Sequence, residues 1–405
     1  MLMMKALNHR PIFRLWIGQA LSSIGDEIYR VGLTWLAVQK IGVDTGYLSA
    51  AQAAALMILS FVGGKWADHR DPLKLMFRVD LMRAFIVLIP VIVSFFMPVP
   101  FSLLVVVAIS LSGLGAFFDP ALQTLLPKFC PDRQTLRAAT GLMSTTIRMG
   151  RMIGPGIVGL LAGIVPPLHF FSLDSVSFLI SALFVRSLGD ASQNETRKTA
   201  RLSFSQALMS GFQALQKSKE MTFVVLCKAI TTSTWNIAYG LGFALRVQEL
   251  APNDTKSFGF VIAAYGIGNF LGALYFGNLQ RNRPALMMFA GYIWLGVGFI
   301  LTAFCPTIVW ILPVAFISGF SGTMNEVTFA DLVQSHFQVA EISRIFRLRA
   351  ATDTAATLLL MLLAPIYLRV VSVQTVFAIC GVAWVAVGIT GLGKYSRVLD
   401  RTNPN

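Results

Sequence analysis

The chain has 405 residues, of which 55% are hydrophobic and only 13% are charged. A soluble domain carries about 25% charged residues, so this composition excludes an ordinary soluble enzyme, a disordered chain and a secreted disulfide scaffold. The net charge of +14 arises from short basic runs between apolar segments. We therefore expect contact with the lipid bilayer and none with nucleic acid.

Twelve apolar segments are long enough to cross a bilayer as helices, which requires about 20 residues each. They lack the period-two alternation of a membrane barrel, so the sequence predicts an all-α integral membrane protein. The expected spans are 13–38, 46–66, 75–97, 101–125, 138–165, 168–188, 221–247, 257–279, 285–304, 307–332, 348–369 and 373–393.

The basic residues are distributed unevenly among the connections between these spans. If the N-terminus is placed in the cytoplasm, the large majority of the 33 Lys and Arg residues fall on the cytoplasmic side. Cytoplasmic loops of membrane proteins collect Lys and Arg. The pattern therefore predicts a multi-pass protein of the inner (plasma) membrane with both termini in the cytoplasm.

One long polar stretch, residues 189–220, follows the sixth span and divides the chain. It predicts an N-terminal six-helix bundle over 1–188, a cytoplasmic linker over 189–220 and a C-terminal six-helix bundle over 221–405. Apolar residues recur at helical spacing from Phe204 to Leu215. This segment is predicted to be an amphipathic helix on the inner membrane surface.

The two halves are predicted to be pseudo-symmetric repeats. Three pairs of residues, one in each half, are separated by nearly the same interval along the chain, as a duplicated six-helix unit requires. They are Asp119 with Glu326, Arg148 with Asp353, and Pro72 with Pro284.

The connection between the second and third spans carries a recognisable motif. Gly64 is followed by Asp68, Arg70 and Lys74, which resembles the signature loop of the major facilitator superfamily. That resemblance implies close helix approach at Gly64 and a gating role for the loop. The sequence departs from the family pattern at Asp71-Pro72, where a glycine and an arginine are usual.

Further segments narrow the resemblance to the twelve-span drug and siderophore exporter branch of this superfamily, which includes the enterobactin exporter and macrolide efflux pumps. These segments are 13–30, 115–127, 141–163 and 173–183. Gly154, Pro155 and Gly159 resemble the helix-bend antiporter motif of the fifth span, although small residues also serve simple helix packing. The fourth span lacks an arginine that is frequent in proton-coupled drug exporters.

Charged residues within spans are the candidate functional groups, because a charge at the bilayer centre costs about 2.5–3.5 kcal/mol. The alternative role for each is a structural ion pair between helices. An excess of cations in a central cavity would suit an anionic, siderophore-like cargo. The predicted substrate-cavity residues are Arg30, Arg148, Lys228, Asp353, Trp235 and Tyr239. The predicted proton-coupling carboxylates are Asp26, Glu27, Glu326 and Asp353.

The combined expectation is a secondary transporter that works by alternating access, and not an enzyme. We expect proton-driven export of a small organic solute, with an anionic, siderophore-like cargo favoured, no metal or cofactor, and a monomer. Three alternatives remain open: a broad-specificity multidrug pump, an importer or lipid flippase of the same fold, and a non-transporting membrane scaffold.

Overall fold

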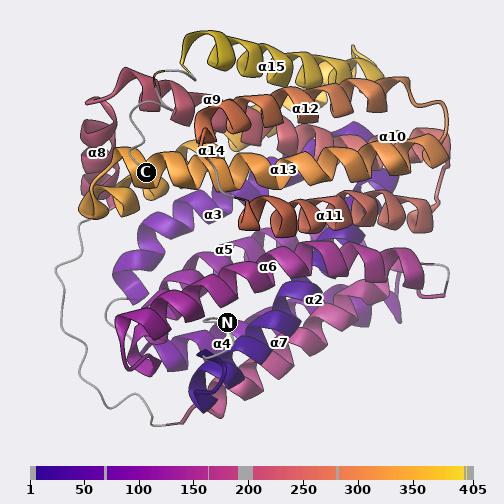
Figure 1. Ribbon diagram of the computed structural model, residues 1–405. Coiled ribbons are helices and arrows are strands. Elements are labelled where there is room, and N and C mark those ends of the chain that lie inside the picture. Colours follow the sequence, from indigo (N-terminus) through magenta and orange to yellow (C-terminus); the bar gives the residue numbers. More distant parts are fainter. Residues whose placement is uncertain are drawn as a thin grey trace. The chain divides into compact units, whose positions relative to one another are not determined.

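The computed structural model describes residues 6–67, 71–162, 164–189, 204–279 and 282–395, together with Val398. Helices joined by short turns make up these residues, and no β-strand occurs among them (Figure 1). The predicted all-α class is therefore confirmed. The helices are α2 (Arg10–Ile41), α3 (Thr45–Ala67), α4 (Pro72–Ser94), α5 (Phe101–Leu125), α6 (Arg133–Leu161), α7 (Phe170–Arg186), α8 (Phe204–Leu215), α9 (Lys219–Trp235), α10 (Phe243–Leu250), α11 (Thr255–Asn278), α12 (Pro284–Phe304), α13 (Ile308–His336), α14 (Val339–Leu368) and α15 (Val373–Lys394).

Each predicted span coincides with a helical segment. The first six spans correspond to α2–α7 and the last five to α11–α15. The seventh span is formed by α9 and α10, which are joined by a π-helical stretch, η4, over Asn236–Gly242. Hydropathy predicted the span but not this local change of hydrogen bonding.

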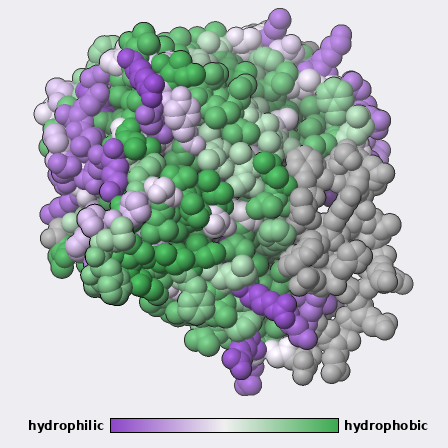
Figure 2. Space-filling view, turned by 180° about the vertical axis from the view of Figure 1, so that it is seen from behind, coloured by the Kyte–Doolittle hydropathy of each residue, from purple (hydrophilic) through white to green (hydrophobic). Residues whose placement is uncertain are grey.

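Seven of the described helical segments are long and apolar enough to cross a membrane by length and composition. They belong to α5, α7 and α11–α15. Helix α2 falls outside this set because Asp26, Glu27 and Arg30 interrupt its apolar sequence. Figure 2 shows that apolar side chains dominate the visible surface, as expected of a protein that faces lipid.

The chain divides into two compact units. The first comprises Met1–Lys40 with Ala51–Arg201, and the second comprises Ile41–Ala50 with Leu202–Asn405.

Asp71 caps α4 by accepting a hydrogen bond from the Leu73 amide at 3.0 Å, and Pro72 begins the helix. Pro284 begins α12 in the same way. The departure from the family pattern at Asp71-Pro72 is therefore a helix start, because proline is favoured at the first helical position.

In the first unit, glycines on α2 allow α7 to approach closely. A side chain at Gly25 would lie 2.7 Å from the Asp174 carboxylate and would overlap the Ser177 hydroxyl. Gly18 and Gly32, seven residues away on either side, face α7 or the turn before it in the same manner. Small residues at regular spacing are what tight helix packing in a membrane requires.

Helix α8 packs on α14 within the second unit. Gly211 lies against the backbone of Arg344, and the Lys217 ammonium contacts the Glu341 carboxylate at 2.7 Å. Ala214 and Leu215 are buried, whereas Met209 and Phe212 are exposed. The predicted helix is therefore present, but part of its apolar surface covers α14 instead of facing lipid.

Candidate functional site

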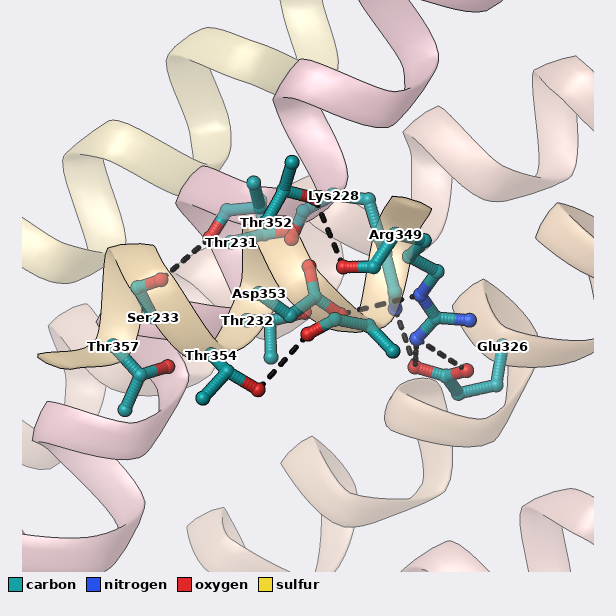
Figure 3. A network of polar contacts seen from close by, with 12 residues as sticks. Lys228, Thr231, Thr232, Ser233, Glu326, Arg349, Thr352, Asp353, Thr354 and Thr357 are labelled. Carbon is teal, nitrogen blue, oxygen red and sulfur yellow. Dashed lines mark hydrogen bonds and ion pairs between the residues drawn. The ribbon is translucent and has the colours of Figure 1, made fainter. Parts of the chain in front are cut away.

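Four charged side chains form a network inside the second unit (Figure 3). The Lys228 ammonium on α9 lies 2.5 Å from Oε1 of Glu326 on α13. One nitrogen of the Arg349 guanidinium on α14 donates to both Glu326 oxygens at 2.9 Å, and its Nε donates to Asp353 Oδ2 at 3.2 Å. We call Lys228, Glu326, Arg349 and Asp353 the charge quartet.

The quartet is balanced in charge and graded in exposure. Two cations face two carboxylates. The exposed fraction of the side chain is 5% for Lys228, 14% for Asp353 and 16% for Arg349, but 38% for Glu326. The Arg349 guanidinium also lies 4.6 Å from the centre of the Phe329 ring, which favours a cation. Glu326 is therefore the member most accessible from outside the network.

The sequence predicted roles for Lys228, Glu326 and Asp353 but none for Arg349, which is the second residue of the expected span 348–369. The structure starts α14 at Val339, so Arg349 lies well inside the helix. The available signal was its spacing from Asp353, because residues at i and i+4 share one helix face. With Arg349 included, the two cations of the quartet match its two carboxylates.

An aromatic cluster lies beside the quartet. The rings of Trp235 and Tyr239 stack with their centres 4.4 Å apart, and Trp235 Nε1 donates to the Tyr265 hydroxyl at 2.7 Å. Asn236 donates to Thr357 on α14 at 3.1 Å, which joins the cluster to the helix that carries Asp353. We call Trp235, Tyr239 and Tyr265 the aromatic wall.

The aromatic wall is built where α9 changes to π-helical hydrogen bonding. The π-helical stretch begins at Asn236, directly after Trp235, and contains Tyr239. Single π-helical turns inside α-helices are rare and occur frequently at functional sites. Trp235 is partly exposed, whereas Tyr239 and Tyr265 are buried, so Trp235 is the most exposed member of the aromatic wall.

The first unit contains a second set of predicted residues. Glu27 is buried and contacts Arg30 on its own helix and Arg151 on α6, the latter at 3.7 Å. The side chains of Arg30 and Arg151 are 47% and 56% exposed. Asp26 is also exposed. The structure thus brings Glu27 and Arg30 together and leaves Asp26 at the surface of the unit.

The helix-bend motif lies at the crossing of α2 and α6. A side chain at Gly154 would overlap the Glu27 side chain and lie 3.1 Å from the Ile24 carbonyl oxygen. Pro155 lies inside α6, and Gly159 is buried. Close approach at Gly154 is what allows Arg151, one turn earlier, to reach Glu27.

Some predicted residues lie partly or wholly outside the described part of the chain. Arg148 belongs to α6, but its side chain is not described. Gly64 lies in α3, whereas Asp68 and Arg70 of the signature loop fall outside the described residues. Lys74 is exposed in the first turn of α4.

The charge quartet depends on the Glu326 carboxylate. Its removal would take away the negative charge that balances two cations at once. Lys228 would then be a buried ammonium without its contact, and breaking a buried ion pair destabilises a fold by about 3–5 kcal/mol. Each cation of the quartet therefore depends on a carboxylate carried by another side chain of the network.

Comparisons with known proteins agree with this fold. The sequence model of the Major Facilitator Superfamily matches residues 15–350. The multidrug efflux pump Tap of Mycolicibacterium fortuitum is 24% identical over 76% of this chain and 77% of its own length. Macrolide efflux protein A of Streptococcus pyogenes is 20% identical over 93% and 94% of the two chains. The staphyloferrin A transporter of Staphylococcus aureus is 21% identical over 88% and 91%.

Two solved structures share the fold. The nucleoside transporter NupG superposes with a TM-score of 0.72 over 95% of this chain and 100% of its own, at 12% identity. A transporter of the POT family superposes with a TM-score of 0.70 over 96% of both chains, at 13% identity. At these identities the likeness concerns the fold alone.

Proposed function

Because the chain belongs to the Major Facilitator Superfamily, we propose that it is a proton-driven secondary transporter that exports a small organic molecule across the inner membrane. Both termini lie in the cytoplasm in this proposal, in keeping with the distribution of Lys and Arg. The charge quartet is the observation that carries it. Four charges inside one helical unit are costly in a bilayer, and a passive scaffold has no use for them.

In this proposal the proton-binding groups of the quartet are its two carboxylates. Glu326 contacts both cations, which favour its ionised form, whereas Asp353 contacts Arg349 and its Oδ1 has no hydrogen-bond partner among the described residues. A proton on Asp353 would change the charge balance of the quartet and weaken its contact with Arg349. A proton moving down a membrane potential of about 100 mV supplies about 2.3 kcal/mol, a large part of the about 3–5 kcal/mol that breaking a buried ion pair costs.

The aromatic wall supports an amphipathic cargo with apolar or ring-containing parts. Stacked aromatic rings offer a large apolar surface with a few polar atoms at their edges. The cations of the quartet already contact carboxylates. This unit therefore favours a cargo that does not need a cationic side chain as its binding partner. Macrolide and multidrug efflux by relatives of this chain agrees with such a cargo.

An anionic, siderophore-like cargo is the second candidate, and one observation favours it. The guanidinium groups of Arg30 and Arg151 meet at Glu27 in the first unit and remain about half exposed. Arginine binds carboxylates in a bidentate manner. A relative named as a staphyloferrin A transporter agrees with this cargo.

The test is transport by the purified full-length protein in proteoliposomes with an imposed pH gradient. Erythromycin represents the amphipathic cargo, and staphyloferrin A represents the anionic one. We expect gradient-driven movement of erythromycin that stops when the gradient is collapsed. Movement of staphyloferrin A alone, lost in Arg30→Gln, would support the second candidate. Movement of a probe in the opposite direction would indicate an importer. Movement of lipid would indicate a flippase, and no movement of any probe would indicate a scaffold.

A further inference from the structure

Two uncharged polar side chains connect the aromatic wall to the helix that carries part of the charge quartet. Asn236 directly follows Trp235 and is the first residue of the π-helical stretch. Thr357 lies one turn of α14 beyond Asp353 (Figure 3). Asn236 Nδ2 donates to Thr357 Oγ1 at 3.1 Å, and both residues are partly exposed. We call Asn236 and Thr357 the amide–hydroxyl pair.

The hydrogen bonds of Asn236 leave its side-chain oxygen unused. Nδ2 donates a second hydrogen bond, to the Thr232 carbonyl oxygen at 3.0 Å. A backbone carbonyl can only accept, so the atom that faces it is the amide nitrogen. Oδ1 has no hydrogen-bond partner among the described residues, and it is not fully buried. Asn236 therefore keeps one free acceptor.

The Thr357 hydroxyl supplies the complementary group. Its oxygen accepts from Asn236, and its hydrogen is donated to no partner in the described part of the chain. Thr354, on the same helix, differs because its hydroxyl donates to the Ala350 carbonyl oxygen at 2.9 Å, as threonine hydroxyls in helices commonly do. Thr357 therefore keeps a free donor. Because Oδ1 and Nδ2 of Asn236 share one carbon atom, the free acceptor lies close to this donor.

A free donor beside a free acceptor matches a hydroxyl group of a ligand, which both donates and accepts. A carboxylate only accepts and an ammonium group only donates, so either would leave one member of the pair unmatched. An apolar group placed over the pair would remove water from both members without replacing its hydrogen bonds, which lowers affinity. The charges of the quartet do not alter this preference, since its cations already contact its carboxylates.

We propose that Asn236 and Thr357 determine specificity by binding a hydroxyl group of the cargo, while Trp235 contacts an apolar part of the same molecule. The cargo class is an amphipathic molecule that carries hydroxyl groups beside an apolar surface, as sugar-bearing compounds do. This inference rests on the transport function proposed above and adds the chemical group that selects among cargoes.

Equilibrium binding of erythromycin to the purified full-length protein tests this inference without a proton gradient. Erythromycin carries several free hydroxyl groups, and O-acetylated erythromycin keeps the same skeleton without those donors. The wild type should bind erythromycin more tightly than the acetylated compound. In Thr357→Val, which replaces the hydroxyl by a methyl group of similar size, the Kd for erythromycin should rise about two- to tenfold, whereas the Kd for the acetylated compound should not rise. Thr357→Ser should restore the wild-type Kd.

Thr354→Val is the matched control, because the hydroxyl that it removes is already bonded to its own helix. It should bind both compounds as the wild type does. Asn236→Leu should raise the Kd for erythromycin as Thr357→Val does, and the double variant should lose less than the sum of the two, because both residues bind one group. Three results overturn the inference: no binding of erythromycin by the wild type, an unchanged Kd in Thr357→Val, or an equal rise for both compounds, which would show a structural role.

The proteoliposome assay separates this inference from the proposed function. Gradient-driven movement of erythromycin with the same KM in the wild type and in Thr357→Val refutes the role of the amide–hydroxyl pair and leaves the function standing. Absence of gradient-driven movement in the wild type refutes the proposed function, and the binding measurements then decide separately whether the pair recognises a hydroxyl group.

Discussion

Replacement of Glu326 by glutamine removes the carboxylate that lies 2.5 Å from the buried Lys228 ammonium and 2.9 Å from Arg349. Loss of one partner from a buried ion pair destabilises a fold by about 3–5 kcal/mol. Because 38% of the Glu326 side chain is exposed and water screens part of the interaction, we expect the lower end, about 3 kcal/mol. For a unit of about 200 residues this lowers the melting temperature by about 6–12 °C.

A double-mutant cycle tests whether the loss comes from the stranded cation. Lys228→Met together with Glu326→Gln removes the buried charge as well as its partner, so most of the stability should return. The melting temperatures of the four proteins are measured in the same lipid mixture. The exposed pair Arg369–Asp44, with side chains 59% and 37% exposed, is the control, and its Arg369→Gln variant should lose less than about 1 kcal/mol. Additive losses in the double variant would refute the reasoning.

Three further outcomes follow from described contacts. Trp235→Ala should weaken apparent erythromycin affinity by about two- to tenfold, measured as KM in proteoliposomes; an unchanged KM would remove Trp235 from the cargo site. Gly154→Val should place a side chain against Glu27 and destabilise the first unit by about 1–3 kcal/mol, whereas Gly277→Ala, which meets open space, should not. The hydrogen bond from Lys217 lowers the pKa of Glu341, so its contribution to α8 docking is present at neutral pH and is lost as the pH falls through that lowered pKa. Glu341→Gln should therefore speed hydrogen exchange in α8 at neutral pH but not at acidic pH. An effect of the same size at both pH values would contradict this.

Hydropathy predicted the helices well because a bilayer requires long apolar segments with internally satisfied backbones. It failed where a charge lies inside a span but near its end. Arg349 received no predicted role because it is the second residue of the expected span 348–369, whereas in the structure α14 already begins at Val339. The π-helical stretch at Asn236–Gly242 leaves no mark in hydropathy at all.

The partnerships of the charged residues were harder to predict than their positions. Composition and span assignment suggested that cations outnumber their partners, but they do not specify which helices touch. Asp80 received no role from the sequence, and its hydrogen bond to Ser181 joins residues 101 positions apart. Only the packing of α4 on α7 brings these side chains together. The same holds for Lys228, whose neutralising carboxylate lies on α13.

The π-helical stretch between α9 and α10 is a point at which the two parts of the seventh span can rotate relative to each other. An α-helix advances by about 1.5 Å and turns by about 100° for each residue. Conversion of Asn236–Gly242 to α-helical pairing would therefore rotate Phe243–Leu250 by about this angle and withdraw the Arg246 guanidinium from the Cys305 carbonyl, which it contacts at 2.8 Å. A change of hydrogen bonding in the π-helical stretch would thus alter both the aromatic wall and the contacts of α10 in the same span.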